Sequence, residues 1–270
     1  MKFDSATLDA LVADISGSAK YRTLSPDLIR RIGAAELANR PSLKVAIQET
    51  RSRLHQSAGA YLDSTPPYSR WIAALDAAED DALPDLFLQW MRCHASTRER
   101  LPLFQQQFRE VIQAVGPFTS VLDVACGLNP LAFPFMGLPT EVRYSGCDLY
   151  SDMMEFLIRC YRRLGVNGEF TMADAVGQPP SISADLAIIL KFLPVVEQNR
   201  RGGALAWLQS IPAKTLLVSF PTGSLSGRGK GMATNYEARF LETIAPTGWQ
   251  AEKLLYPGEL FFIVRKSPAV

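Results

Sequence analysis

From Phe118 onward, short apolar runs rich in β-branched residues alternate with segments of helical periodicity. This alternation predicts an α/β fold with a mostly parallel sheet covered by helices, because parallel strands must be joined by crossover connections. The last two runs are joined instead by a short Pro257-Gly258 turn, which predicts a terminal β-hairpin. We therefore expect a sheet of seven strands from the runs TSVLDVA, VRYSGCDL, GEFTMAD, ADLAIILKFL, AKTLLVSFP, GWQAEKLLY and GELFFIVRK.

The first part of the chain has a different pattern, with helix after helix and no convincing alternating strand. Stretches rich in Ala, Leu, Arg and Glu are interrupted near Pro26, Pro41 and Pro66, where proline punctuates helices. The sequence therefore predicts a helical N-terminal domain, residues 1–116, followed by a sheet domain, residues 117–270.

Composition limits the class and the location of the protein. Hydrophobic residues make up 47% of the 270 residues, which suffices for a sizeable core and excludes intrinsic disorder. No window approaches the roughly 18 uninterrupted apolar residues of a membrane span. Asp4, Asp9 and Asp14 stand where a secretory signal has its apolar stretch. We therefore expect a soluble, cytoplasmic protein.

The cysteine pattern does not indicate a metal site or a disulfide framework. The chain has four cysteines, without a CxxC pair, and two histidines, which is poor material for zinc. We expect no bound metal and interpret as buried thiols the residues Cys93, Cys126, Cys147 and Cys160.

Net charge gives no direct indication of a nucleic-acid partner. The 28 Lys+Arg and 27 Asp+Glu give a formal charge of +1, and neither half of the chain is basic. Local clusters of cations occur, but most such clusters are solvated helix faces. Any affinity for RNA must therefore come from a few cations gathered on one face.

The first strand of the sheet domain ends in a turn of small residues, in the run VLDVACGLNP at 121–130. Small residues let the backbone approach a ligand and present its N–H groups to it. The usual glycine pattern is incomplete, because Ala125 and Asn129 stand where glycines are common and Gly127 remains. Alone, the turn is a weak indicator of a nucleotide site.

Acidic residues close the next two strands. Asp148 follows Gly127 by 21 residues, the spacing at which a carboxylate reaches ribose hydroxyls. Asp174 ends the third strand, where it can accept from an adenine amine. Ligands of open α/β sheets lie across the carboxyl ends of the strands, so these three strand ends predict a nucleoside site. The alternative is that both aspartates only cap the helices that follow.

Nicotinamide cofactors and S-adenosyl-L-methionine (SAM) share the ribose carboxylate but differ at the turn. A pyrophosphate needs a tight glycine cluster at a helix N-terminus, whereas SAM has no phosphate. The glycine-poor turn and an available arginine for the methionine carboxylate favour SAM. The terminal hairpin does so too, because it belongs to the Rossmann-like sheet of class I SAM-dependent methyltransferases, whereas dehydrogenases continue with parallel strands.

Four segments carry a family resemblance: HASTRERLP at 94–102, DVACGLNPLAFPFMGLP at 123–139, LKFLPVVE at 190–197 and SFPTGSLSGRGKGM at 219–232. Together they resemble the 16S rRNA (guanine-N7) methyltransferases of the guanine-1405 type, which confer aminoglycoside resistance. The resemblance implies methylation in the decoding region of 16S rRNA, within the assembled 30S subunit. It also implies resistance to 4,6-disubstituted deoxystreptamine aminoglycosides, and an N-terminal domain that docks on rRNA and completes the cofactor pocket.

The resemblance assigns cofactor-binding roles to several residues. Arg100 matches the residue that holds the methionine carboxylate, a bidentate role suited to a guanidinium. Gly127 matches the backbone cradle, Asp148 the ribose ligand and Asp174 the adenine ligand. The other residues expected at the pocket are Tyr61, His94, Ala125, Leu149, Ala175 and Lys191, with Tyr68 at its border. The alternatives are a capping or core-edge histidine, a strand-end lysine that faces solvent, and tyrosines of the core.

The loop GSLSGRGKGM combines glycines with two cations between a strand and a helix. Under the resemblance this loop holds the target RNA, with Arg228 and Lys230 on phosphates and Met232 against the guanine. The alternative is a flexible surface loop. No catalytic residue is expected, because guanine N7 carries a lone pair and no proton, and its attack needs no general base.

The helical domain carries two short cation clusters that a compact bundle can bring together, Lys20 with Arg22 and Arg51 with Arg53. We expect these four residues to contact rRNA phosphates; the alternative is scattered, solvated charges. Two other functions stay open from the residues alone. One is another SAM-dependent RNA or small-molecule methyltransferase, and the other is a non-catalytic RNA-binding protein with this fold.

Overall fold

A seven-stranded sheet forms the centre of the computed structural model, which describes residues 4–57, 66–222 and 232–267. The strand order is β3-β2-β1-β4-β5-β7-β6. Strands β1 to β5 are parallel, and β7 pairs antiparallel with both β5 and β6. The predicted fold class is therefore confirmed. The strands are β1 Ser120–Val124, β2 Arg143–Asp148, β3 Gly168–Met172, β4 Ala184–Leu190, β5 Ala213–Pro221, β6 Gln250–Tyr256 and β7 Glu259–Arg265.

The register of the parallel strands aligns their carboxyl ends. Val121 of β1 lies between Tyr144 of β2 and Leu186 of β4, and all five residues of β1 are buried. Apolar runs of this kind fit a sheet covered on both faces. The residues that directly follow β1, β2, β3 and β4 therefore meet at one edge of the sheet.

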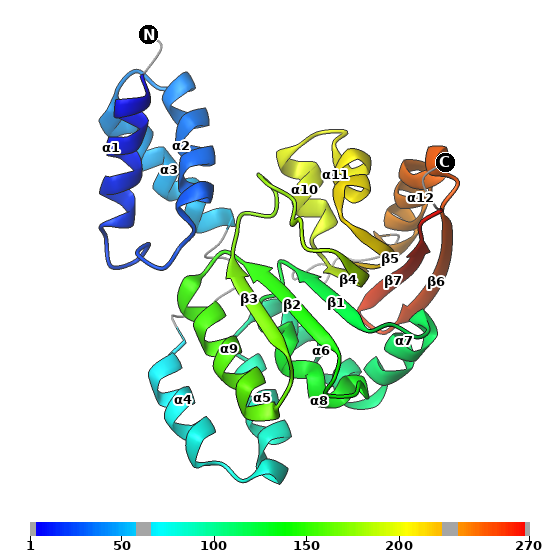
Figure 1. Ribbon diagram of the computed structural model, residues 1–270. Coiled ribbons are helices and arrows are strands. Elements are labelled where there is room, and N and C mark those ends of the chain that lie inside the picture. Colours follow the sequence, from blue (N-terminus) through cyan, green and yellow to red (C-terminus); the bar gives the residue numbers. More distant parts are fainter. Residues whose placement is uncertain (1–3, 58–65, 223–231, 268–270) are drawn as a thin grey trace.

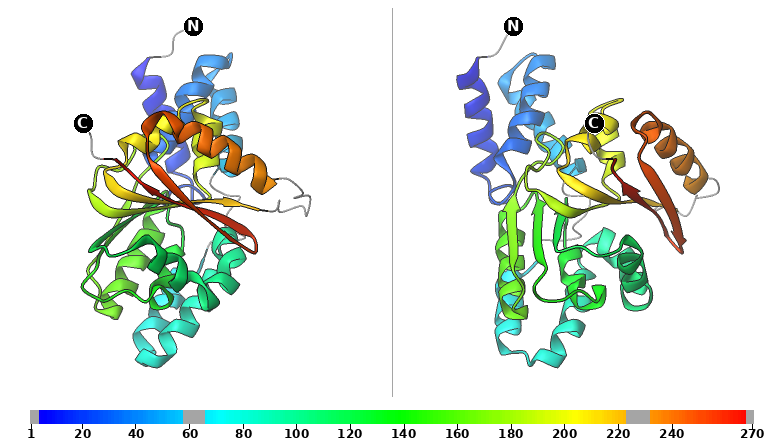
Figure 2. Two further views of the ribbon diagram at one scale, coloured as in Figure 1. Left: turned by 90° about the vertical axis from the view of Figure 1, so that its right-hand side faces the viewer. Right: turned by 45° about the vertical axis from the view of Figure 1, so that its right-hand side comes forward.

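Helices cover both faces of the sheet (Figure 2). Buried side chains of α10, α11 and α12 share one hydrophobic core with one face, and those of α4 to α9 share another core with the opposite face. The helices of the first face are α10 Leu193–Asn199, α11 Ala204–Ser210 and α12 Met232–Ile244. Those of the second are α4 Tyr68–Ala77, α5 Leu83–Met91, α6 Ala95–Gln106, α7 Phe108–Val115, α8 Phe133–Met136 and α9 Ser151–Leu164.

The first three helices form a bundle with a hydrophobic core of its own, which includes Leu11, Ile29 and Leu54. We call this unit the N-terminal bundle; it consists of α1 Ser5–Ser16, α2 Pro26–Asn39 and α3 Leu43–Ser57. It stands beyond the carboxyl ends of β2 and β3 (Figure 1). Helices α4 to α7 instead share a hydrophobic core with one face of the sheet. The boundary near residue 116 between a helical domain and a sheet domain stays a prediction.

The cysteines occupy the core more than the surface. Cys126, Cys147 and Cys160 are free and buried, so the interpretation as buried thiols is confirmed for these three. It is wrong for Cys93, which is only half-buried. Burial raises the pKa of Cys147 to about 12. Within the described ranges, no group of His, Cys, Asp and Glu is arranged to hold a metal ion, and no helix is long and apolar enough to cross a membrane.

Candidate active site

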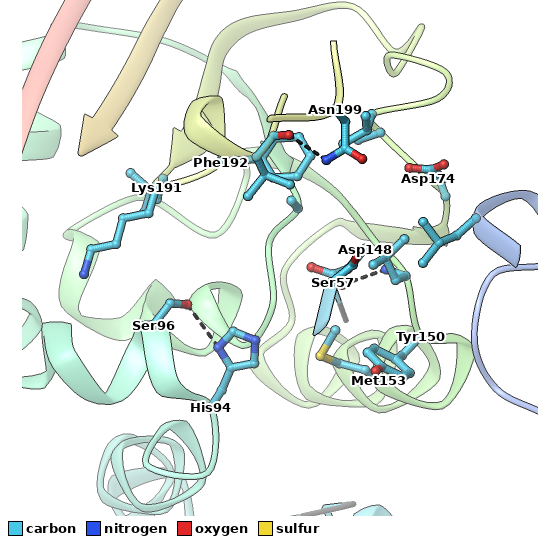
Figure 3. A pocket seen from close by; sticks show the side chains of 18 of the residues that line it. Ser57, His94, Ser96, Asp148, Tyr150, Met153, Asp174, Lys191, Phe192 and Asn199 are labelled. Atoms are coloured by element: carbon cyan, nitrogen blue, oxygen red, sulfur yellow. Dashed lines mark hydrogen bonds between the residues drawn. The ribbon is translucent and has the colours of Figure 1, made fainter. Parts of the chain in front are cut away.

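A pocket lies at the carboxyl edge of the sheet, where the strand ends meet (Figure 3). Its walls come from the turns after β1, β2, β3 and β4, from the start of α6 and from the N-terminal bundle. Seven of the predicted cofactor-binding residues line it: His94, Ala125, Asp148, Leu149, Asp174, Ala175 and Lys191. Lining residues that the sequence did not indicate are Leu28, Arg31, Ser57, Ser96, Tyr150, Met153, Ala173, Val176, Leu190, Phe192, Val195 and Asn199.

The turn after β1 depends on small residues. Ala125 and Gly127 both have left-handed backbone conformations, with φ of 53° and 50°, which cost free energy for residues other than glycine. A Cβ on Gly127 would lie 2.8 Å from Cε1 and 2.9 Å from Nε2 of His94. The imidazole is oriented by Ser96, whose Oγ is 3.0 Å from His94 Nδ1 (Figure 3). This close approach explains why glycine remains here although the rest of the glycine pattern is missing.

Asp148 is fixed by the backbone of the turns around it. Its Oδ2 accepts from the Gly127 N–H at 2.8 Å, and its Oδ1 accepts from the Leu149 N–H at 2.6 Å. Burial raises the pKa of Asp148, whereas these two hydrogen bonds lower it. Helix α9 begins after Tyr150 without any side-chain cap, so Asp148 is not a helix cap. The carboxylate keeps acceptor positions for a ligand in the pocket.

Asp174 is buried and bound by an arginine of the N-terminal bundle. Arg31 Nε donates to Asp174 Oδ2 at 2.6 Å and Nη2 donates to Oδ1 at 3.2 Å. A turn, and no helix, follows Asp174, so this aspartate is not a helix cap either. No sequence pattern links the two residues, which lie 143 positions apart.

Arg100 and Lys191 belong to a network of charges beside the pocket. Arg100 is 3% exposed, and its Nε donates to both carboxylate oxygens of Glu259, at 2.9 and 2.8 Å. Lys191 Nζ lies 2.6 Å from Glu99 Oε2 and 3.5 Å from Glu259 Oε2. Glu259 also accepts from Ser219 Oγ. The sequence reasoning missed Glu259 and Ser219, which lie on β7 and β5.

One guanidinium nitrogen in this network has no partner. Arg100 Nη2 is buried and, in the part of the chain that the structure describes, makes no hydrogen bond. A buried unpaired donor of this kind is costly unless a ligand satisfies it. A guanidinium nitrogen fits a carboxylate, as expected for the methionine end of SAM. Arg100 itself does not line the pocket and lies beside it. The residues present therefore fit the expected cofactor.

The sequence matches the ribosomal RNA methyltransferase family FmrO over residues 17–263. The chain belongs to this family. It is 36% identical over 266 residues to a 16S rRNA (guanine(1405)-N(7))-methyltransferase of Frankia casuarinae, across 96% of this chain and 94% of that relative. A relative of the same name from Serratia marcescens is 38% identical over 260 residues, across 96% of this chain and 98% of the relative.

A solved structure of the same kind is also similar. The 16S rRNA methyltransferase RmtF, in complex with S-adenosyl-L-homocysteine, matches with a TM-score of 0.82 and 30% identity, across 98% of this chain and 100% of that one. The predicted family resemblance is thus confirmed. The pocket of this methyltransferase lies at the carboxyl ends of the strands, where open α/β sheets bind their ligands.

Other predicted residues of this methyltransferase lie apart from the pocket or outside the described residues. Tyr61, Arg228 and Lys230 fall outside them. Met232 is the first residue of α12 and is half-buried. Tyr68 is not among the residues that line the pocket, and its ring packs 5.2 Å from Phe156 in the core; a place at the border of the pocket stays a prediction. In Figure 3 the Lys191 side chain extends away from Asp148 and Asp174.

The cations expected to dock on RNA lie on two segments of the N-terminal bundle, and Arg51 and Arg53 pair with different helices. The Tyr21 hydroxyl donates to the Arg51 carbonyl oxygen at 3.1 Å, so the loop with Lys20 and Arg22 touches α3. Arg51 pairs with Asp14 at 2.8 Å, and Arg53 pairs with the buried Glu36 at 2.5 Å. Two of the four charges are thus shared with carboxylates of the bundle itself. The exposed Arg22 forms no ion pair with any described residue.

Proposed function

We propose that this methyltransferase transfers the methyl group of SAM to N7 of guanine 1405 in 16S rRNA. The observation that carries the proposal is nearly full-length similarity to enzymes named for this reaction, in a chain whose pocket holds two carboxylates at successive strand ends. The cofactor supplies an activated methyl group on a sulfonium.

The residues of the chain hold the cofactor by three groups of contacts. Asp148 accepts from the ribose hydroxyls, and Asp174 accepts from the adenine amine. Arg100 Nη2, buried and without a hydrogen-bond partner among the described residues, donates to the methionine carboxylate. The turn at Gly127 supports this site, because its N–H binds Asp148 and the missing side chain leaves room for the His94 ring, which lines the pocket.

The reaction needs alignment and no proton transfer at the protein. Guanine N7 attacks with its lone pair, so the enzyme must hold N7, the methyl carbon and the sulfur close to a line, with N7 about 3 Å from the carbon. The target base must be unstacked for this attack. Met232, at the start of α12, packs against it, and Arg228 and Lys230 hold the neighbouring phosphates.

The substrate is the assembled 30S subunit, and the N-terminal bundle docks on it. Lys20, Arg22, Arg51 and Arg53 contact phosphates that folded RNA presents in a fixed array, which suits a chain with a net charge of only +1. Such a substrate places the enzyme in the cytoplasm. The added methyl group and positive charge obstruct 4,6-disubstituted deoxystreptamine aminoglycosides, which gives resistance.

The test is transfer of label from SAM to three substrates: 30S subunits, free 16S rRNA and a pool of small metabolites. We expect labelling of 30S subunits, with much less on free rRNA and none on metabolites. Labelling of metabolites alone would indicate a small-molecule methyltransferase. No labelling by a protein that binds 30S subunits would indicate a non-catalytic RNA-binding protein.

A further inference from the structure

Arg31 joins the N-terminal bundle to the carboxylate that faces adenine in the proposed function. Besides its two hydrogen bonds to Asp174, Arg31 donates through Nη1 to Asn199 Oδ1 at 3.2 Å. The Asp174 side chain is 4% exposed and that of Arg31 is 30% exposed. A bidentate pair of this kind, with its carboxylate buried, is more specific in geometry than a surface ion pair.

The loop after Asp174 leaves room for this pair. A Cβ on Gly177 would lie 2.8 Å from Asp174 Oδ2 and 3.3 Å from Arg31 Cδ. Arg200 Nη2 donates to the Gly177 carbonyl oxygen at 2.7 Å and holds the loop in place. A side chain at this position would therefore displace the Asp174 carboxylate and crowd Arg31.

A second contact of the N-terminal bundle lies beside Asp148. Leu24 forms an antiparallel bridge with Tyr150. In this bridge the Ser25 N–H donates to the Leu149 carbonyl oxygen, and the Ser151 N–H donates to the Thr23 carbonyl oxygen, both at 2.8 Å. Leu149 and Tyr150 directly follow Asp148 and line the pocket. The bundle, which has its own core, is thus attached next to both carboxylates.

We propose that Arg31 is a positioning residue of the cofactor site and links cofactor binding to the placement of the N-terminal bundle. A carboxylate offers about four acceptor positions, and Arg31 uses two, so adenine can bind while Arg31 fixes the orientation of Asp174. Adenine in turn holds Asp174, and through Arg31 it holds the bundle. Because linkage is reciprocal, cofactor and RNA strengthen each other's binding. The role in RNA binding rests on the proposed function.

The first test measures binding of S-adenosyl-L-homocysteine (SAH) to the free protein by calorimetry. Arg31→Met is expected to weaken this affinity at least about tenfold, because Asp174 loses the two charged hydrogen bonds that orient it. Arg31→Lys keeps the charge but not the bidentate geometry, and its SAH affinity is expected to lie between those of the wild type and Arg31→Met. The matched control is Arg30→Met, because Arg30 pairs with Asp9 inside the bundle at 2.6 Å. Wild-type affinity in Arg31→Met overturns the proposal.

The second test measures affinity for 30S subunits with and without saturating SAH. In the wild type and in Arg30→Met, SAH is expected to tighten 30S binding about fivefold or more, and in Arg31→Met this tightening is lost. A purely structural role of Arg31 would lower both affinities and keep their ratio, which contradicts the linkage. Absence of tightening in the wild type contradicts it as well.

The two tests also separate this proposal from the proposed function. Calorimetry uses no RNA, so its result on Arg31 stands whatever the substrate is. A wild-type protein that binds SAH but not 30S subunits contradicts the proposed function, and the calorimetric comparison then decides about Arg31 alone. Should Arg31→Met fail to fold, the two single variants Arg31→Lys and Asn199→Ala are each compared with the wild type by the same calorimetry. Wild-type SAH affinity in both variants overturns the role of Arg31.

Discussion

Gly127 is fixed by two constraints in the turn after β1, its positive φ and the His94 ring 2.8 Å from a Cβ. Gly127→Ala is therefore expected to lower the free energy of unfolding by about 1–3 kcal/mol. It should also weaken SAH binding at least about tenfold, because either the ring or the turn must move. Urea unfolding and calorimetry measure the two effects.

The matched control for this variant is Gly165→Ala. Gly165 has a φ of 67°, and no atom lies within 4 Å of its Cβ position, so the substitution adds backbone strain without a collision. A loss of about 1 kcal/mol with unchanged SAH affinity is expected. Equal effects of the two variants on SAH binding would show that the His94 contact does not shape the cofactor site.

Asp148 is expected to contribute to cofactor binding directly. Asp148→Ala leaves the ribose hydroxyls unpaired in a desolvated site, at a cost of about 1–3 kcal/mol in SAH binding free energy. Glu155→Ala is the control, because Glu155 is exposed on α9 outside the pocket lining. Unchanged SAH affinity in Asp148→Ala would show that this carboxylate does not bind the ribose.

Asp123, beneath the turn, makes folding stability depend on pH. Burial raises its pKa from 3.8 to about 6, against hydrogen bonds from Asn129 and Tyr144 that lower it. Between pH 4 and 6 the folded state then binds a proton that the unfolded state has released, so this group's contribution to stability falls as pH rises.

The measurement compares wild type with Asp123→Asn. The difference in unfolding free energy, wild type minus variant, is expected to fall by up to about 3 kcal/mol between pH 4 and pH 7. A difference that is flat over this range would show that Asp123 titrates at its ordinary pKa.

At the scale of the elements, the start of β7 holds the two cations beside the pocket. Glu259 lies between Arg100 and Lys191 and is 2% exposed. Glu259→Gln leaves buried positive charge without compensation and is expected to destabilise the fold by about 3–5 kcal/mol. The control, Glu252→Gln on β6, removes a half-exposed partner of Arg265 and should cost less than about 1 kcal/mol. Similar losses in thermal unfolding would contradict the structural weight given to Glu259.

The strands and the pocket edge could be predicted because their signals are local. Each strand is an apolar run of the sequence. The carboxyl ends of parallel strands lie at one edge of the sheet, so the positions of Asp148 and Asp174 at the ends of two strands suffice to predict that they lie close together. Arg31 pairs with Asp174 across 143 positions, and Arg100 pairs with Glu259 across 159. No periodicity or spacing encodes such pairs, because tertiary packing alone brings them together.

At the scale of the whole molecule, a chain with a net charge of +1 must find RNA through one face. Reversing Lys20 and Arg22 together is expected to weaken 30S binding and to make the salt slope of log K shallower by nearly one unit per lost phosphate contact. Arg53 should be changed to Gln, since a carboxylate beside the buried Glu36 would disturb folding, and Arg51, which pairs with Asp14, is changed to Gln as well.

The control reverses Arg143 at the start of β2 and Arg162 in the last turn of α9, two exposed cations at the opposite edge of the sheet. This variant should keep the wild-type salt slope, and both variants should keep their SAH affinity. An unchanged slope after reversal of Lys20 and Arg22 would show that docking uses another face.

The position of the methyl group on the RNA tests the central claim most directly. Purified enzyme, SAM and 30S subunits are incubated, the 16S rRNA is extracted, and chemical cleavage specific for 7-methylguanine is mapped by primer extension. The account predicts one new cleavage site, at guanine 1405, that is absent when Asp148→Ala replaces the wild type. Labelled rRNA without cleavage at guanine 1405 would contradict it.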